Sequence, residues 1–387
     1  MIVKPKVREF ICTTAHPVGC AENVKKQIQK IKKEEPILNG PKNVLIIGSS
    51  TGYGLATRMV TAFGAGANTL GVMFEREAQG KRTATPGWYN TKAFEKEAEK
   101  AGIYAKTLNG DAFSRQMKEA VIETIKADLG QVDLVVYSLA APKRMTEEGI
   151  LYSSTLKTTG EPFTNKSLNL KDNTVSEKTV DCANEEEITN TVKVMGGEDW
   201  MDWMDALYDS GVLAKGAITV AYSYIGPKLT YPIYNHGTIG QAKKHLAKTA
   251  EDITKKYQDY GVKGYISVNK ALVTQASAAI PIVPLYIAIM YDVMKGKGVH
   301  EGCLEQMDRL FREKNFMKEP VTDENGLIRL DDWELKDEVQ EEIMRRYSIV
   351  TSDNVMELAD IEGYWDDFYQ MFGFHVEDVD YEADVEV

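Results

Sequence analysis

The stretch that decides the fold is Asn43-Val-Leu-Ile-Ile-Gly-Ser-Ser-Thr-Gly-Tyr-Gly54. Its first part is short, β-branched and apolar on both faces, which is typical of a central strand in a parallel sheet. The glycines that follow lead into the helical pattern of Leu55-Ala-Thr-Arg-Met-Val60. Glycines at such a turn let backbone amides approach a pyrophosphate, whose charge the helix N-terminus stabilises. The stretch therefore predicts a strand, a phosphate-binding loop and a helix.

Further apolar runs follow this unit and alternate with helical patterns. In the first half we expect strands at residues 68–75, 103–108 and 132–140, and a helix at 112–129. In the second half we expect strands at 217–225 and 264–269, and a helix at about 238–260. Alternation of this kind predicts an α/β fold with a doubly wound parallel sheet covered by helices.

A polar segment interrupts the alternation. Residues 142–199 are polar and rich in Thr, Ser, Asn, Lys and Glu. We interpret 142–210 as an inserted lid, with hairpins and loops that lead into a helix at 200–208. The whole chain, 1–387, is then one enlarged domain. Its parts are a first nucleotide-binding half at 43–141, the inserted lid, a second half with the catalytic pair at 217–295, and a helical C-terminal extension at 300–387 with a strand-like run at 327–330.

Composition excludes several classes of protein. The 387 residues include 46 basic and 58 acidic side chains, a net charge of −12, which disfavours nucleic-acid or anionic-membrane binding through overall charge. The most apolar stretch, 278–290, is interrupted by Pro281 and Pro284 and is too short to span a membrane. The N-terminus is too charged for a signal peptide, and the four cysteines form no C-x-x-C pair. We therefore expect a cytoplasmic protein without a membrane segment, a disulfide framework or a metal site.

An acidic residue at the end of the second expected strand indicates which dinucleotide binds. The loop has the spacing G-x-x-x-G-x-G, which resembles that of short-chain dehydrogenases. Glu75 lies about 20 residues past its last glycine, where a carboxylate accepts hydrogen bonds from the adenine-ribose hydroxyls. Because a carboxylate there repels a 2′-phosphate, the sequence favours NADH over NADPH. Arg76, Lys81 and Arg82 support the alternative, since they could pair with that phosphate.

Two further strand ends are placed to meet the cofactor. Asp111-Ala112 follows the third expected strand, where the adenine ring would lie. Ser138-Leu-Ala-Ala141 follows the fourth and puts small residues where a cofactor would pass.

A tyrosine and a lysine in the second half of the chain are candidate catalytic residues. Thr238 and Gln241 form a capping-box pattern, so a helix is expected to begin near Ile239. Tyr234 then lies in the loop before the helix and Lys243 inside it. On one unbroken helix these side chains would point to roughly opposite faces, whereas a loop lets them converge. A lysine ammonium near a phenol favours the phenolate and strengthens the phenol as an acid.

The eight residues between Tyr234 and Lys243 are unusual, since the pair lies four apart on one helix in ordinary short-chain dehydrogenases. At this spacing the chain resembles the trans-2-enoyl-CoA reductases and the similar V-type enoyl-ACP reductases, and the resemblance covers almost the whole sequence. Besides the glycine loop and the Tyr234 and Lys243 pair, it rests on Tyr137-Ser-Leu-Ala-Ala-Pro142, Val194-Met-Gly-Gly-Glu-Asp-Trp200, Tyr222-Ser-Tyr-Ile-Gly226 and Val268-Asn-Lys-Ala-Leu-Val-Thr274.

The resemblance implies a Rossmann fold like an enlarged short-chain dehydrogenase, and NADH-dependent reduction of the double bond of a short-chain 2-enoyl-CoA such as crotonyl-CoA. It implies that Tyr234 donates to the thioester oxygen, Tyr224 contacts substrate and Lys243 holds the nicotinamide ribose. It also implies a monomer. The cofactor-lining residues that it implies are Gly48, Ser49, Ser50, Thr51, Gly52, Tyr53, Phe74, Glu75, Asp111, Ala112, Leu139, Ala140, Lys243, Leu272, Val273 and Thr274.

Three alternatives stay open. An enoyl-ACP reductase would need a basic docking surface for an acidic carrier protein, and a net charge of −12 disfavours it mildly. A carbonyl-reducing dehydrogenase is disfavoured by the eight-residue gap, and a nucleotide sensor without turnover by the presence of both Tyr234 and Lys243. The apolar run 278–288 suits either a wall for an acyl chain or ordinary core. His236 is interpreted as structural or exposed.

Overall fold

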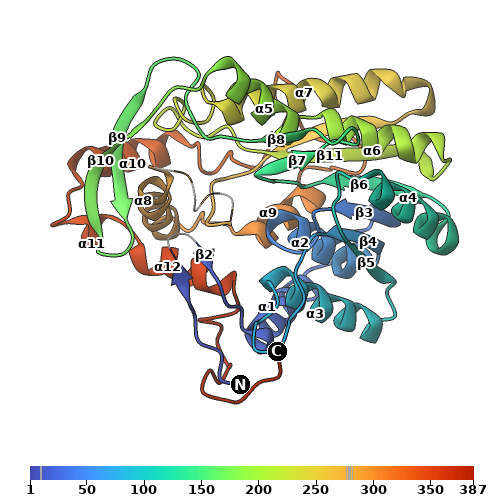
Figure 1. Cartoon of the computed structure of the whole chain (residues 1–387), viewed down its shortest axis with the longest axis horizontal. Coiled ribbons are helices and arrows are strands. Elements are labelled where there is room, and N and C mark those ends of the chain that lie inside the picture. The colour runs from blue at the N-terminus through green and yellow to red at the C-terminus, as the bar shows by residue number, and fades with distance from the viewer. Residues whose placement is uncertain (9–10, 276, 278–279, 281) are drawn as a thin grey trace.

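The computed structural model describes residues 1–8, 11–275, 277, 280 and 282–387. Its central sheet has seven parallel strands in the order β13-β12-β11-β6-β3-β4-β5 (Figure 1). They are β3 (Asn43–Ile47), β4 (Asn68–Met73), β5 (Ala105–Asn109), β6 (Val132–Tyr137), β11 (Leu213–Ser223), β12 (Lys263–Val268) and β13 (Leu327–Arg329). After β3, the chain adds β4 and β5 on one side of that strand and then β6, β11, β12 and β13 on the other. The order of the strands therefore reverses between β3 and β6. The predicted doubly wound sheet is confirmed.

Helices cover both faces of this sheet. Against Val44 and Ile46 of β3 pack α1 (Pro17–Ile31), α2 (Gly52–Met59), α3 (Pro86–Lys100) and α9 (Cys303–Arg312). Against Leu45 and Ile47 pack α4 (Arg115–Thr124), α6 (Glu198–Asp209) and α7 (Thr238–Lys256). Successive strand residues point to opposite faces, so a strand covered on both sides must be apolar throughout. This explains why β3 could be recognised from its residues.

A third apolar core lies over the carboxyl ends of the strands. It is built from α8 (Val283–Gly296), α10 (Asp337–Ile349), α12 (Ile361–Gln370) and the hairpin of β9 (Phe163–Asn169) and β10 (Thr174–Val180), which surround α8 in Figure 1. Tyr234 and Leu272 belong to this core. The second half of the sheet and the C-terminal extension therefore meet at the predicted site.

The hairpin of β9 and β10 is hydrogen-bonded to the C-terminal extension. Lys166 Nζ of β9 donates to the carbonyls of Tyr347, Ser348 and Val350 at the end of α10, at 3.1, 2.9 and 3.0 Å. The Tyr347 hydroxyl donates to the Lys166 carbonyl at 2.7 Å. A cation suits a helix C-terminus because the last carbonyls carry partial negative charge.

The inserted segment has more helix than predicted. It contains two hairpins, β7 (Lys143–Met145) with β8 (Leu151–Ser153) and β9 with β10, as expected. It then forms α5 (Glu185–Met195) before α6, and the helix at 200–208 is the greater part of α6. Helix α5 was not predicted, although its capping box of Asn184 and Glu187 is a local signal for a helix start.

Several predicted boundaries are wrong by a few residues. Strands β4 and β6 end at Met73 and Tyr137, because the chain then leaves the sheet to form loops at its edge. The helix expected at 112–129 begins at Arg115, after a turn capped by Asp111, and ends in a π-helical turn at Ile125–Leu129. The expected run at 327–330 is confirmed as the edge strand β13.

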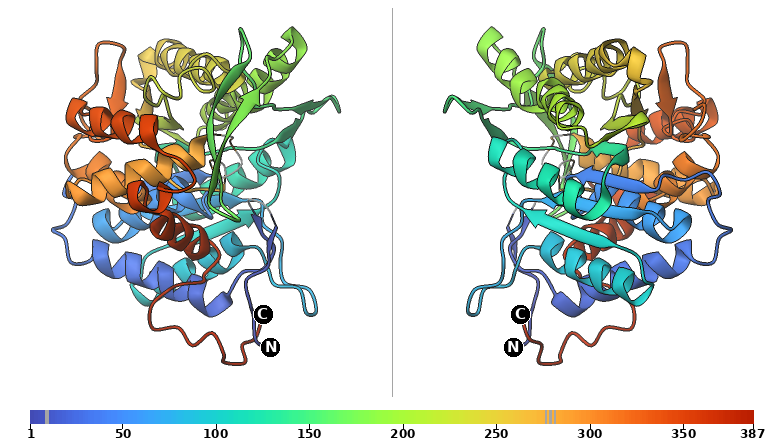
Figure 2. Two further views of the ribbon diagram at one scale, coloured as in Figure 1. Left: turned by 90° about the vertical axis from the view of Figure 1, so that its left-hand side faces the viewer. Right: turned by 90° about the vertical axis from the view of Figure 1, so that its right-hand side faces the viewer.

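The two chain ends lie together (Figure 2). Val385 N donates to the Met1 carbonyl at 3.2 Å, and the small strands β1 (Val7–Arg8) and β2 (Ile11–Cys12) pair nearby. The short α11 (Val355–Leu358) links α10 to α12. All four cysteines are free thiols. Across the described ranges, the chain forms no helix with the length and apolarity needed to cross a membrane.

Candidate active site

The predicted site residues gather at one edge of the sheet. The loops that carry them follow β3, β4, β5, β6, β11 and β12, all parallel, so each loop leaves the same edge. Open α/β sheets bind ligands in the crevice outside the carboxyl ends of their strands, where strand order reverses. Here that point lies between β3 and β6.

The glycine loop is packed so tightly that side chains could not replace two of its glycines. A Cβ atom on Gly48, whose φ is +89°, would lie 2.1 Å from the Ser138 carbonyl oxygen, and one on Gly54 would lie 1.9 Å from the Gly48 carbonyl oxygen. Gly52, with φ +53°, begins α2, and a Cβ atom there would meet nothing within 4 Å. The loop therefore presents bare backbone at a helix N-terminus, which fits a pyrophosphate.

Glu75 is held at the end of β4 by its neighbours. Its Oε1 accepts a hydrogen bond from Ser50 Oγ at 2.6 Å, and its backbone exchanges two 2.8 Å bonds with the side chain of Asn109. Phe74 beside it is 79% exposed. Of the basic residues that would favour NADPH, Arg76 donates to the Thr83 carbonyl at 3.3 Å, and Lys81 and Arg82 are exposed. The positions of Glu75 and of the three basic residues fit the binding of an adenosine whose ribose hydroxyls are free, as in NADH.

Replacing Glu75 by Ala is expected to shift the ratio of kcat/KM for NADH to that for NADPH about 10- to 100-fold toward NADPH. If Glu75 has its predicted role, the change removes a charged acceptor for the ribose hydroxyls, a contact of about 1.5–3 kcal/mol, and the repulsion of a 2′-phosphate. Steady-state kinetics with both cofactors measure the ratio. Glu77→Gln, at an exposed carboxylate two residues away, is the matched control. An unchanged ratio in Glu75→Ala would contradict the assignment.

The residues predicted to meet the adenine ring and to line the passage of the cofactor follow β5 and β6. Asp111 Oδ1 accepts from Phe113 N at 2.9 Å, so this carboxylate stabilises its own turn. The Ala112 carbonyl accepts from Trp203 Nε1 at 3.2 Å. Leu139 Cδ2 would lie 3.2 Å from a Cβ atom on Gly48, and Ala140 is exposed. The loops after β3 and β6 are thus in contact, as the prediction requires.

Tyr224 and Tyr234 lie together beyond β11. Their ring centroids are 4.7 Å apart and the rings cross at 80°. Tyr234 N donates to the Thr230 carbonyl at 2.9 Å, and the side chain is buried in the third core. Burial and the charge of Glu334 raise the pKa of both phenols above the ordinary value. Both are therefore neutral hydrogen-bond donors.

Lys243 lies in α7 and reaches the end of β11, where its Nζ donates to the Tyr222 carbonyl at 3.0 Å. Burial lowers the pKa of Lys243 to about 8. Tyr234 lies in the loop and Lys243 in the helix, as predicted. The expectation that Lys243 favours a Tyr234 phenolate is wrong here, because burial and Glu334 raise the pKa of that phenol instead.

The predicted capping box of Thr238 and Gln241 is also wrong. The N-cap is Gly237 and α7 begins at Thr238, whose hydroxyl donates to the Thr155 carbonyl. Thr238 N donates to the Lys157 carbonyl at 2.9 Å. The inserted segment therefore satisfies the groups that a capping box would have used. His236 is exposed, as expected, and its carbonyl accepts from Thr159 N at 2.8 Å.

The loop after β12 lies against α8. Val273 N donates to the Tyr291 hydroxyl at 3.1 Å, and Ser277 Oγ donates to the Leu272 carbonyl at 2.6 Å. Thr274 N donates to Ser277 Oγ at 2.9 Å. Of the suggested acyl-chain wall, Ala278, Ala279 and Pro281 lie outside the described residues. The part from Val283 to Ala288 is buried in the third core as the start of α8.

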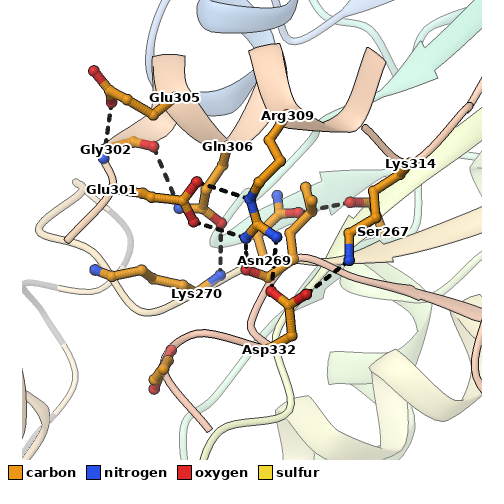
Figure 3. Close-up of polar contacts among 12 residues, drawn as sticks. Ser267, Asn269, Lys270, Glu301, Gly302, Glu305, Gln306, Arg309, Lys314 and Asp332 are labelled. Atoms are coloured by element: carbon orange, nitrogen blue, oxygen red, sulfur yellow. Dashed lines mark hydrogen bonds and ion pairs between the residues drawn. The ribbon is translucent and has the colours of Figure 1, made fainter. Parts of the chain in front are cut away.

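Some residues at the site were missed by sequence reasoning. Gln306 Nε2 of α9 donates to the Tyr53 hydroxyl at 2.8 Å, and Gln306 Oε1 accepts from Lys270 N at 2.9 Å. The Tyr53 hydroxyl donates to the Lys270 carbonyl at 3.0 Å. Figure 3 shows Gln306 and Lys270 side by side. Glu334 was missed too. Single polar residues in otherwise ordinary segments give no motif, so no sequence signal could have found them.

Three family profiles match the chain. They are the NAD(P)H binding domain of trans-2-enoyl-CoA reductase at residues 2–80, the trans-2-enoyl-CoA reductase catalytic region at 82–316, and the enoyl reductase FAD binding domain at 322–385. Residues 322–385 are all described, and they form β13, α10, α11 and α12 without a glycine-rich loop between a strand and a helix. They do not fit a flavin dinucleotide, and no catalytic step is assigned to one.

Whole-chain relatives agree with the profiles. An enoyl-[acyl-carrier-protein] reductase [NADH] of Cytophaga hutchinsonii is 54% identical over 100% of this chain and 98% of its own. Structures of a Clostridium trans-2-enoyl-CoA reductase with NADH and a Treponema denticola trans-2-enoyl-CoA reductase with NAD are 45% and 46% identical. Both cover 100% of this chain and 98% of their own, with a TM-score of 0.96. The chain therefore belongs to the family of trans-2-enoyl-CoA reductases and V-type enoyl-ACP reductases and is an NADH-dependent enoyl reductase, an oxidoreductase acting on CH–CH groups.

Proposed function

We propose that this enzyme reduces the double bond of a short-chain 2-enoyl-CoA such as crotonyl-CoA, with Tyr234 as hydrogen-bond donor to the thioester oxygen. The observation that carries the proposal is the pair of Tyr224, which is half-buried, and Tyr234, which is buried, with ring centroids 4.7 Å apart, at the edge where the glycine loop and Glu75 also lie. NADH supplies a hydride to the β-carbon. The protein must then stabilise the charge that develops on the thioester oxygen.

A neutral phenol suits that task. A preorganised donor aimed at a developing oxyanion contributes about 3–4 kcal/mol of transition-state stabilisation. The raised pKa of Tyr234 keeps its proton in place, and the apolar third core around it strengthens the interaction by excluding water. Tyr224 contacts the substrate from the adjacent position. Lys243, which reaches the end of β11, would hold the nicotinamide ribose through its ammonium group.

The remaining proposed cofactor contacts come from the strand-end loops. They are Gly48, Ser49, Ser50, Thr51, Gly52, Tyr53, Phe74, Glu75, Asp111, Ala112, Leu139, Ala140, Leu272, Val273 and Thr274. Their placement at one sheet edge supports the proposal.

An enoyl-ACP reductase is the second candidate. The curated relatives that favour it include the Cytophaga reductase at 54% identity, above the 45% and 46% of the two CoA reductases of known structure. The net charge of −12 favours the smaller CoA ester over an acidic carrier protein. Both carriers use the same proposed active site.

The deciding experiment follows NADH oxidation by the purified protein with crotonyl-CoA and with a matched crotonyl-ACP, and repeats both with NADPH. A kcat/KM at least about tenfold higher for the CoA ester would establish the first proposal. The reverse preference would establish the second. Tight NADH binding with no turnover of either ester would reject both and favour a nucleotide sensor.

The ammonium of Lys243 predicts a pH dependence of cofactor binding. Because burial lowers the pKa of Lys243 to about 8, the side chain is charged below that pH and loses its charge as the pH rises through it. Losing a charge-assisted contact should raise the Kd for NADH about three- to tenfold between pH 7 and pH 9.5. Fluorescence titration of NADH across this range measures the effect.

Two methionine variants serve as test and control. Lys243→Met should bind NADH more weakly, with a Kd that no longer depends on pH. Lys270→Met should keep the dependence, since burial lowers the pKa of Lys270 to about 8 as well but its Nζ donates to the Ala271 carbonyl at 2.9 Å. A pH dependence that disappears in Lys270→Met and persists in Lys243→Met would contradict the assignment.

A further inference from the structure

A buried carboxylate from the C-terminal extension lies beside the two proposed substrate-facing tyrosines. Glu334, between β13 and α10, has no solvent exposure. Its Oε1 accepts hydrogen bonds from the Tyr286 hydroxyl at 2.6 Å and the Tyr224 hydroxyl at 3.1 Å, and its Oε2 accepts from Ala271 N at 2.7 Å. It thus joins the loop after β11, the loop after β12 and helix α8. Burying a carboxylate costs desolvation free energy, which these three hydrogen bonds offset.

These bonds settle the orientation of the hydroxyl groups. Tyr286 accepts from Gln340 Nε2 at 3.2 Å, so its own proton is directed at Glu334. The proton of Tyr224 is directed there too. The hydroxyl of Tyr234, in contrast, has no hydrogen-bond partner among the residues that the structure describes. Within the described part of the chain the two neighbouring phenols therefore differ: the Tyr224 proton is engaged by Glu334, and the Tyr234 proton is engaged by no described group.

The backbone that carries Glu334 is itself held firmly. Arg309 of α9 is 4% exposed and donates to the Leu330 carbonyl at 2.7 Å and to Asp332 Oδ1 at 2.8 Å (Figure 3). It also forms two bonds to Glu301, and its guanidinium lies 4.4 Å from the centroid of the Trp333 ring. Arg309 thus contacts Leu330, Asp332 and Trp333, which directly precede Glu334. Such support is what a group needs if it is to orient another side chain precisely.

We propose that Glu334 is a positioning residue for enoyl reduction, which engages the Tyr224 hydroxyl and thereby leaves Tyr234 as the oriented donor to the thioester. The proposal rests on the proposed function, since it gives Glu334 a role only if Tyr234 serves an enoyl thioester. Glu334 acts through Tyr224, whose ring packs edge-on against Tyr234 with centroids 4.7 Å apart. The C-terminal extension thus completes the active site of the sheet.

The test is a double-mutant cycle on kcat with crotonyl-CoA, or with crotonyl-ACP if that ester is preferred. Glu334→Gln should lower kcat about 10- to 100-fold, because the amide cannot accept from both Tyr224 and Ala271 N at once, while the Kd for NADH stays within about twofold. In a Tyr224→Phe background, the same change should lower kcat by less than about twofold. A purely structural role would lower kcat by the same factor in both backgrounds.

Asp128→Asn is the matched control. Asp128, like Glu334, accepts from a tyrosine hydroxyl, that of Tyr104; it accepts from Lys106 as well, and it lies at the surface near the opposite edge of the sheet. Its kcat should equal that of the wild type. If Glu334→Gln does not fold, Glu334→Asp replaces it, because a carboxylate one methylene shorter is expected to lose first the longest of the three contacts, the 3.1 Å bond from Tyr224. It should give the same loss and the same dependence on Tyr224.

The outcomes separate this inference from the proposed function. A wild-type protein that reduces neither ester would reject the function. An active wild type with a folded Glu334→Gln that retains full kcat would reject only the role of Glu334. So would equal losses in the wild-type and Tyr224→Phe backgrounds.

Discussion

Replacing Tyr234 by Phe is expected to lower kcat for a 2-enoyl thioester about 100- to 1,000-fold while leaving the Kd for NADH within about twofold. The change removes a single hydroxyl and keeps the ring, which packs against Tyr224 in the third core. Only the proposed donor to the developing oxyanion is lost. Steady-state kinetics with crotonyl-CoA and fluorescence titration of NADH measure the two quantities separately.

Tyr231→Phe is the control for this variant. Tyr231 lies three residues earlier in the same loop and is partly exposed, so losing its hydroxyl should leave kcat unchanged. Thermal unfolding of both variants should give midpoints close to that of the wild type, because neither change opens a cavity. Wild-type turnover by Tyr234→Phe would remove the proposed donor and turn attention to Tyr224, the other phenol at the site.

The nucleotide half could be predicted because its signals are local. Strand β3 is apolar at every position since helices cover both of its faces, and that pattern is visible without any tertiary information. Once the strands are known to be parallel, their carboxyl ends must meet at one edge. The placement of Glu75 and Asp111 at the same sheet edge as the glycine loop follows from topology alone.

The third core could not be predicted in this way. Its contacts join residues far apart in the sequence, such as Tyr224 and Glu334, which are separated by 110 positions. Glu334 follows a short edge strand in an acidic segment, where one more carboxylate carries no signal. Only packing of the C-terminal extension on α8 shows that this carboxylate is buried and paired with tyrosines.

Contacts between residues far apart in the sequence also explain two wrong predictions, the capping box of Thr238 and the effect of Lys243 on Tyr234. The capping box failed because Thr155 and Lys157 of the inserted segment bind the groups that begin α7. The expected effect of Lys243 on Tyr234 failed because burial and, after it, the charge of Glu334 raise the pKa of that phenol. In both cases a segment distant in sequence overrides a local pattern. Local motifs single out Tyr234 and Lys243 as candidates, but the electrostatic environment of Tyr234 depends on the extension.

The second large effect is expected at the glycine loop. Gly52→Leu should raise the Kd for NADH at least about 100-fold, or about 2.8 kcal/mol, and should lower kcat/KM for NADH by a similar factor. A side chain on Gly52 meets no protein atom within 4 Å, so it would occupy the open side of the loop, where backbone amides must approach the pyrophosphate. The fold itself should tolerate the change. Fluorescence titration of NADH and a thermal unfolding curve measure the two effects.

Gly66→Leu separates the loss of binding from backbone strain. Gly66 also has a positive φ, +71°, and also faces open space within 4 Å, but it precedes β4 at the opposite edge of the sheet. Both substitutions force a side chain into the left-handed region, which costs about 1–2 kcal/mol, so both should lower the unfolding midpoint by a few degrees. Only Gly52→Leu should lose NADH. Equal NADH affinities in the two variants would mean that the pyrophosphate does not lie against Gly52, and the placement of the cofactor at the junction of β3 and β6 would have to be abandoned.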